Sequence, residues 1–211
     1  MSPGKTFRSS IVVATFLITG NANALTIAGI TFPDNGFADV VLSTNAAASH
    51  FVTGDPQVVV TATFAITGSN QDSYFDPSGG EYVQLGFTDH VIRNGVGNDF
   101  AVFEIGTAEV AAIRLTSGGT QRTAQSIYTG FDNSWGAPIN VAWFDLADFG
   151  LGPNATIDSL FLYPVGAPEF SAVGAIPEPN TALLLGFGLV GLGVKTRRRG
   201  ASHSGDGKAS S

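Results

Sequence analysis

The sequence predicts an all-β protein built as an antiparallel β-sandwich, with an additional apolar helix at each end of the chain. Between residues 25 and 175 no helical period is sustained, and short apolar or alternating runs rich in Val, Ile, Phe and Thr follow one another. Clusters of Gly, Asn, Asp and Pro separate these runs and are typical of turns. About nine strands in roughly 150 residues fit two packed sheets, because each sheet must bury one face.

Each expected strand is an apolar or alternating run that ends where turn-forming residues begin. The runs are 25–32, 37–42, 58–66, 82–87, 100–105, 110–115, 139–145, 157–163 and 170–176. The turn signals between them are 34–36, 53–56, 76–80, 94–98, 117–119 and 150–153. The chain has no cysteine, so we expect one domain that is stabilised without disulfides, either by its core or with the help of a bound metal.

The first 24 residues are typical of a signal peptide. Lys5 and Arg8 give a positive start, and residues 11–18 form a short apolar core for a signal helix. Ala22 and Ala24 flank Asn23 in an A-x-A cleavage site. We therefore expect signal peptidase to cut before Leu25 and the chain to be exported.

The C-terminal segment is typical of a membrane anchor with a defined orientation. Pro177-Glu178-Pro179 precedes an uncharged, Leu- and Gly-rich stretch, and a helix over 178–196 would measure about 28 Å against a hydrocarbon core of about 30 Å. Lys195, Arg197, Arg198 and Arg199 follow. Positive residues stay on the cytoplasmic side, so the sandwich is expected to face outward.

These three features in this order make residues 176–200 resemble the PEP-CTERM sorting signal of Gram-negative bacteria. The resemblance implies recognition by an exosortase, processing near Pro177-Glu178-Pro179, anchoring in the inner membrane during transit, and a final place at the cell surface or outside the cell. It also implies an association with exopolysaccharide and the biofilm matrix. Similar tails carry the label of an ice-binding protein C-terminal segment. Residues 201–211 depart from the pattern and are expected to be a disordered end.

A second resemblance covers residues 82–176. The stretches 85–90 and 97–104, a strand ending in Gly-Phe and then Gly-x-Asp-Phe-x-Val-Phe-Glu, resemble a jelly-roll domain of exported envelope proteins. The resemblance implies a galactose-binding-like sandwich that often holds a structural calcium and sometimes binds sugar. Tyr163-Pro164 stands where this pattern leads us to expect an acidic residue, so one implied ligand is missing.

The charge of the expected domain restricts its partners. Residues 25–176 contain three arginines, no lysine and 15 acidic residues, which gives 3 − 15 = −12. Such a surface repels nucleic acid and anionic lipid. The same acidity either attracts divalent cations or only aids solubility.

Four acidic residues near expected strand ends are candidate ligands of a structural calcium: Asp89, Asp99, Glu104 and Glu169. None lies in a D-x-D-x-D-G loop. Asp99 and Glu104 are five positions apart, so on a regular strand they lie on opposite faces unless a bulge intervenes. The alternative is that Asp99 closes a turn and Glu104 is paired inside the sandwich.

A Gly-flanked loop offers a candidate sugar site. Phe131, Asn133 and Trp135 place aromatic rings beside a polar side chain that could hydrogen-bond hydroxyls. The alternative is that Trp135 packs at the rim of the sandwich, as large aromatic side chains commonly do.

Catalytic motifs are missing from the sequence. It has no G-x-S-x-G, no H-E-x-x-H and no cysteine, and only His50 and His90 occur in the expected domain. We therefore expect a non-enzymatic protein of the cell surface or extracellular matrix. The alternatives are a carbohydrate-binding module and an extracellular polysaccharide hydrolase.

Overall fold

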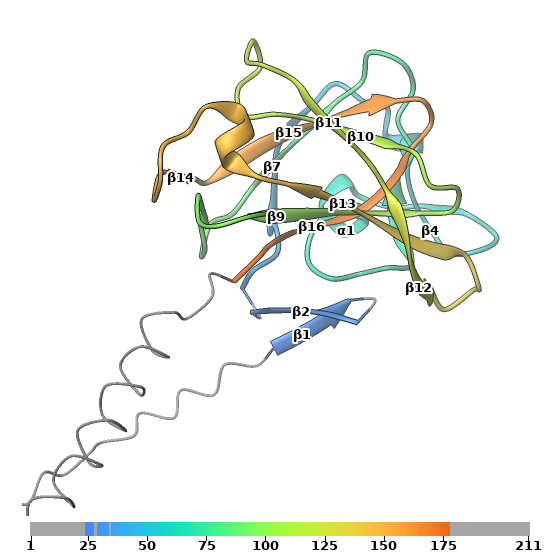
Figure 1. The fold of residues 1–211 in the computed structure, drawn as a ribbon. Coiled ribbons are helices and arrows are strands. Elements are labelled where there is room, and N and C mark those ends of the chain that lie inside the picture. The colour runs from blue at the N-terminus through green and yellow to red at the C-terminus, as the bar shows by residue number, and fades with distance from the viewer. Residues whose placement is uncertain (1–23, 28, 34, 178–211) are drawn as a thin grey trace, which may run out of the picture.

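Two antiparallel sheets face each other in the computed structural model, which describes residues 24–27, 29–33 and 35–177 (Figure 1). The seven-stranded sheet has the order β12 (Ile127–Asp132), β13 (Pro138–Phe144), β9 (Phe100–Ile105), β16 (Glu169–Ala175), β6 (Ser73–Phe75), β4 (Phe51–Thr53) and β5 (Val58–Val59). The five-stranded sheet has the order β11 (Arg122–Gln125), β10 (Val110–Arg114), β15 (Ser159–Val165), β7 (Val83–Gly86) and β3 (Val40–Thr44). The predicted all-β sandwich is confirmed, and the two sheets are consistent with a jelly-roll-like fold.

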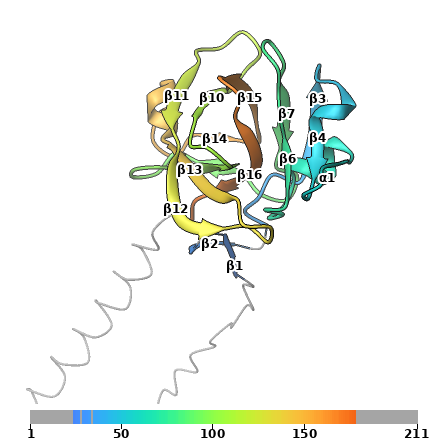
Figure 2. The same cartoon turned by 90° about the vertical axis from the view of Figure 1, so that its right-hand side faces the viewer.

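Smaller elements complete the described chain. The strands β1 (Ala24–Ile27) and β2 (Ile30–Pro33) form a hairpin, and β8 (Ile92–Arg93) pairs with β14 (Thr156–Ile157). The helices are short: α1 (Ala62–Ile66) and the 3-10 helices η1 (Ala48–His50) and η2 (Leu146–Phe149). Figure 2 shows β10, β15 and β7 side by side, with β16 of the other sheet below them.

The strand β9 is buried on both faces of the seven-stranded sheet and contributes side chains to the packing on each face. Its six residues FAVFEI are all buried. Phe100 and Val102 point into the core between the two sheets, whereas Ala101 and Phe103 point to the other face of the seven-stranded sheet. A strand covered on both faces is expected to be apolar at nearly every position.

The β1–β2 hairpin covers that other face as a third layer (Figure 1). Phe32 of the hairpin meets Phe103 edge-on with ring centroids 5.6 Å apart, and Phe37 lies 4.9 Å from Phe32. Gly174 of β16 makes this approach possible, because a Cβ there would lie 2.8 Å from Cε1 of Phe32 and 3.1 Å from Cε1 of Phe37. The hairpin is therefore fitted to a glycine in the sheet beneath it.

Replacing Gly174 by alanine is expected to destabilise the fold by about 1–3 kcal/mol, because the added methyl group overpacks the hairpin interface. Urea unfolding measures this loss. Gly118→Ala is the matched control, since nothing lies within 4 Å of a Cβ at Gly118, and its effect should stay within about 0.5 kcal/mol. Equal stability of the two variants would contradict the close approach.

Two expected strands are wrong in part. The run 25–32 is the β1–β2 hairpin, with Gly29 in the turn, and not one strand. The run 58–66 forms β5 only at Val58–Val59 and then turns into helix α1. Thr61 caps that helix, because its side chain accepts a hydrogen bond from the backbone N–H of Phe64. The cap provides a local alternative to continued strand pairing.

The predicted terminal helices fall outside the described residues. Ala24 belongs to β1, and the rest of the predicted signal peptide precedes the described chain. The expected anchor helix over 178–196 follows it. Among residues 24–27, 29–33 and 35–177, no helix is long and apolar enough to cross a membrane.

Candidate ligand-binding face

Three aromatic side chains gather on the outer face of the five-stranded sheet. Phe161 and Tyr163 alternate along β15 with Leu160 and Leu162, which are buried in the core between the sheets, so the pleat turns the two rings outward. Tyr82, next to β7, lies beside both, with ring centroids 5.6 Å from Phe161 and 5.7 Å from Tyr163. We call Tyr82, Phe161 and Tyr163 the aromatic patch.

A cation adjoins the aromatic patch. The guanidinium carbon of Arg114, on the neighbouring strand β10, lies 4.4 Å from the ring centroid of Tyr163. This distance is typical of a cation–π contact. Arg114 also donates from Nη2 and Nε to Oε1 of Gln121, at 2.9 and 3.2 Å, and from Nη1 to the carbonyl of Ser117 at 3.4 Å. These hydrogen bonds hold the guanidinium over the ring.

Amide and hydroxyl groups border the opposite side of the aromatic patch. Gln84 of β7 pairs in register with Phe161, and its Oε1 accepts a hydrogen bond of 2.9 Å from the Ser43 hydroxyl of β3. Tyr82 and Tyr163 are half-buried, and within the described residues neither phenol hydroxyl has a protein hydrogen-bond partner. The face therefore combines fixed rings with polar groups that remain available.

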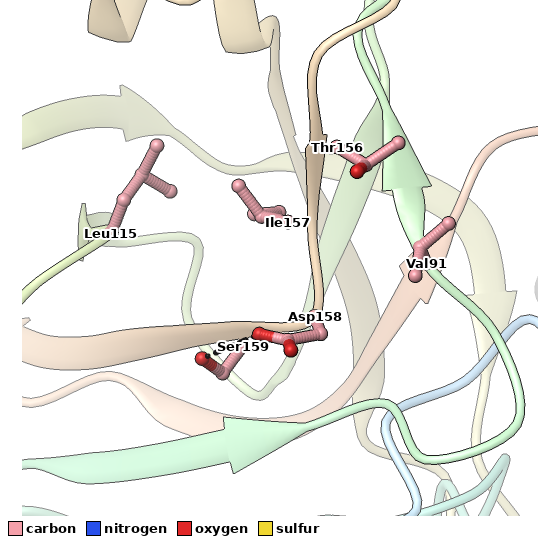
Figure 3. A pocket seen from close by; sticks show the side chains of 6 residues that line it. All are labelled: Val91, Leu115, Thr156, Ile157, Asp158 and Ser159. Carbon is pink, nitrogen blue, oxygen red and sulfur yellow. Dashed lines mark hydrogen bonds between the residues drawn. The ribbon is translucent and has the colours of Figure 1, made fainter.

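A series of hollows lies beyond the aromatic patch, around Asp158. Three adjoining hollows of about 260, 290 and 520 Å³ share this residue. Figure 3 shows the first, in which the Ser159 hydroxyl donates a 3.2 Å hydrogen bond to Asp158. Asp89 and His90 line the largest hollow. This places the predicted residue Asp89 beside Asp158.

The predicted calcium ligand Asp99 has a structural role at one end of β9. It is only 4% exposed, and its two carboxylate oxygens accept backbone hydrogen bonds from Gly95 at 2.8 Å and Leu146 at 2.7 Å. The carboxylate thus ties the loop before β9 to the start of η2. This corresponds to the turn-closing alternative.

Glu104 and Glu169 lie at the opposite end of β9, on neighbouring strands. Glu104 is 2% exposed; one oxygen accepts from the Ser126 hydroxyl and from the Glu109 N–H at 3.1 Å, and the other is buried without a partner. Burial raises the pKa of Glu104. Burial, and then the nearby carboxylates of Asp76, Glu104 and Glu109, raise the pKa of Glu169 to about 7.

The four carboxylates predicted for calcium do not converge on one place. Among the described residues, no three His, Asp or Glu side chains form a group that could hold a metal ion. The structure brings Glu104 and Glu169 together, whereas Asp99 is used by backbone N–H groups and Asp89 lines the hollow at Asp158. A structural calcium at these four residues stays a prediction.

The loop predicted to bind sugar is closed largely by its own contacts. The side-chain oxygen of Asn133 accepts from the backbone N–H groups of Trp135 and Ala137, and its amide nitrogen donates to the carbonyl of Gln71. Trp135 is half-buried and packs on Tyr74 with ring centroids 6.4 Å apart. Only Phe131, at 50% exposure, presents much of its side chain to solvent. Trp135 thus has the rim-packing position of the alternative interpretation.

The aromatic patch was missed in the sequence, although a signal for it exists. The expected strand 157–163 is interrupted at Asp158, between β14 and β15, and its last four residues, Leu160 to Tyr163, lie in β15 and are all apolar or aromatic. A sandwich strand normally has polar residues on its outward face. Two aromatic residues at alternate outward positions, 161 and 163, are therefore informative.

The predicted sorting signal begins where the fold ends. Strand β16 ends at Ala175, and the Ile176 N–H donates to the carbonyl of Asp99 at 2.8 Å. Pro177 is the last described residue; Glu178, Pro179, Arg197, Arg198 and Arg199 lie outside the described residues.

Comparison with known families identifies one segment of the chain. Residues 175–199 match the model of the PEP-CTERM protein-sorting motif. No curated protein and no solved structure matches the chain. The chain therefore carries, directly after the last strand of its sandwich, a PEP-CTERM sorting motif, which implies export, membrane-anchored transit, processing by an exosortase and a place at the cell surface.

Proposed function

We propose that this is a non-enzymatic protein of the cell surface or extracellular matrix of a Gram-negative bacterium, where its sandwich associates with exopolysaccharide of the biofilm. One observation carries the proposal: the sorting motif starts at residue 175, the last residue of β16. The whole sandwich thus precedes the processing site, so exosortase cleavage would release or transfer it as an intact domain.

The limits of the described strands support a division of the chain into four parts. A signal peptide over 1–24, a sandwich over 25–175, a sorting tail over 176–200 and an end over 201–211 place both cuts outside the core. Strand β1 starts at Ala24, so cleavage before Leu25 removes one residue of the hairpin. The arrangement supports signal peptidase and an exosortase as successive partners.

The contacts of His50 support a non-enzymatic role. Nδ1 of His50 lies 2.6 Å from Oε2 of Glu81, and the same oxygen accepts from the backbone N–H of Ser78 at 2.7 Å. These contacts connect η1 to the turn before β7, which is a structural function. The acidic domain also supports an uncharged matrix partner over nucleic acid or anionic lipid.

Mass spectrometry of the protein recovered from the surface of producing cells tests the sorting proposal. We expect an N-terminus at Leu25 and a C-terminus at or before Pro179. Simultaneous replacement of Pro177, Glu178 and Pro179 by alanine should keep the chain intact to Ser211 and in the membrane fraction. Its surface yield should fall at least about tenfold, because the exosortase must bind this segment in its transition state.

Pro153→Ala is the matched control, because Pro153 lies in an exposed turn away from the motif. This variant should be processed like the unmodified protein. A surface protein with an intact C-terminus through Ser211 would contradict the proposal.

A further inference from the structure

We infer that the aromatic patch, framed by Arg114 and Gln84, is a platform that binds the sugar rings of a neutral polysaccharide. The inference rests on the proposed surface function and adds the site and the chemical class of its ligand. It differs from the loop of Phe131, Asn133 and Trp135, which lies at the edge of the other sheet.

The first argument is the position of the rings. The outer face of the seven-stranded sheet is covered by the β1–β2 hairpin. Phe103 of the sheet and Phe32 of the hairpin pack against each other there, so these aromatic residues have a packing role. The aromatic patch lies on the outer face of the other sheet, where Phe161 is 7% exposed and packs against the half-buried rings of Tyr82 and Tyr163. Aromatic rings gathered at an outer sheet face mark an interaction site more often than isolated apolar residues do.

The second argument is the chemistry of the patch. A pyranose ring has an apolar face of C–H groups, which packs on an aromatic ring, and a rim of hydroxyls, which need hydrogen-bond partners. Arg114 covers one face of the Tyr163 ring, so the sugar would pack on Tyr82 and on the remaining surface of Tyr163. Both tyrosines also provide phenol hydroxyls that have no partner among the described residues. Arg114 and Gln84 place a guanidinium and an amide at the two borders. Mostly apolar surfaces with a few fixed polar groups are typical of binding sites for small polar ligands.

The third argument is the extent of the face. Along β15 and β7, the pair Phe161–Gln84 is followed on the same outward side by the pair Ser159–Gly86. The side chains of Val40 and Leu42 fill the space over Gly86. Next to them, hollows of about 260 and 290 Å³ adjoin Ser159 and Gly86 and share Asp158. The face thus continues from a raised aromatic area into a depression, which provides room for successive rings of a polymer.

The fourth argument is charge. Residues 25–176 carry 3 − 15 = −12, so a second copy of this chain, nucleic acid or an anionic lipid surface would be repelled. A neutral polysaccharide pays no such penalty. The guanidinium of Arg114 is already held by Gln121 and Ser117, so it suits a hydroxyl acceptor beside the ring of Tyr163.

Affinity electrophoresis of the full-length chain tests the inference, in a nonionic detergent without a sugar headgroup so that the detergent cannot compete. The probes are hydroxyethylcellulose, dextran and galactomannan, with alginate as the anionic comparison. We expect at least one neutral probe to retard the protein. Tyr163→Ala should weaken that binding at least about tenfold, as loss of a central aromatic contact does. Tyr163→Phe, which keeps the ring, should weaken it by no more than about threefold.

Trp135→Ala is the matched control and should bind like the unmodified protein. The unfolding midpoint of each variant shows whether it is folded, and Tyr82→Ala provides a second test of the same platform. The inference would be overturned if no neutral probe retarded the protein, or if alginate alone did. It would also be overturned if Trp135→Ala lost the retardation while both tyrosine variants kept it. Correct processing at residues 177–179 together with any of these results would leave the proposed sorting function standing.

Discussion

Replacing Phe103 by alanine is expected to lower the free energy of unfolding by about 3–5 kcal/mol, the usual cost of removing a fully buried phenylalanine. Phe103 has no exposed surface and lies between the seven-stranded sheet and the β1–β2 hairpin, in edge-on contact with Phe32. Its loss leaves a cavity that β9, paired on both sides, cannot close by moving. Urea unfolding followed by circular dichroism measures the change.

Phe64→Ala is the control for this prediction. Phe64 lies on α1 and is 54% exposed, so its truncation should cost much less than that of Phe103. If the two variants lost the same stability, the hairpin would not form a packed third layer, and the assignment of Phe103 to a second core would be wrong.

A second large effect is expected from pH. Burial, Asp76, Glu104 and Glu109 raise the pKa of Glu169 from 4.5 to about 7, and burial also raises the pKa of Glu104. The folded protein therefore binds more protons than the unfolded chain between about pH 4.5 and 7. Stability from these groups is complete below pH 4.5 and is lost as the pH rises to about 7.

Glu169→Gln should remove much of this pH dependence. At pH 8 the variant is expected to be more stable than the unmodified protein by about 1–2 kcal/mol, a value reduced because Glu169 is only partly buried and solvent screens its charge. At pH 4.5 the two proteins should be equally stable within about 0.5 kcal/mol, because Glu169 is then protonated and resembles glutamine. Thermal unfolding across this pH range is the measurement.

Glu81→Gln is the control of opposite sign. Although burial opposes it, hydrogen bonds from the Ser78 N–H, His50 and the Ala47 N–H lower the pKa of Glu81. A carboxyl group whose pKa is lower in the folded protein stabilises the fold at pH values above its pKa in the unfolded chain. This stabilisation is lost as the pH falls through its pKa in the folded protein. Glu81→Gln should therefore destabilise the protein at pH 8. Stabilisation by both substitutions at pH 8 would contradict the pairing of Glu81 with His50.

The sandwich could be predicted because its central strands have unambiguous local signals. The residues of β9 are apolar on both faces between turn-forming segments. The expected runs 110–115, 139–145 and 157–163 overlap most of β10, β13 and β15, although β13 begins one residue earlier and β15 ends two residues later. In these segments local propensity and tertiary burial favour the same structure, so periodicity was sufficient.

Other elements could not be predicted, because pairing with distant residues determines them. Strand β12 is almost entirely exposed and is ordered by β13, with a register shift between Tyr128 and Phe131. Strands β4 and β6 have three residues each and pair with one another across about 20 positions of the sequence. Such short strands have no period of their own that a sequence pattern could reveal.

In the candidate site, too, local sequence was not enough, because residues far apart in the chain come together. The Gly, Asn and Asp residues around Trp135 predict a sugar site. In the structure Asn133 closes the loop through its own hydrogen bonds, and the ring of Trp135 packs on Tyr74. Tyr82 and Tyr163 lie about 80 positions apart, and only the pairing of β7 with β15 brings them together. Glu104 and Glu169 are likewise joined only by the pairing of β9 with β16.

The place of β16 has a mechanical consequence. This last strand is internal to its sheet, with β9 on one side and β6 on the other, and six of its residues are in register with β9. Tension applied through residue 176 along the direction of β16 therefore loads its hydrogen bonds to β9 together, in shear. A sandwich held by its C-terminal end in flowing water would resist drag at the very strand to which the tether is joined.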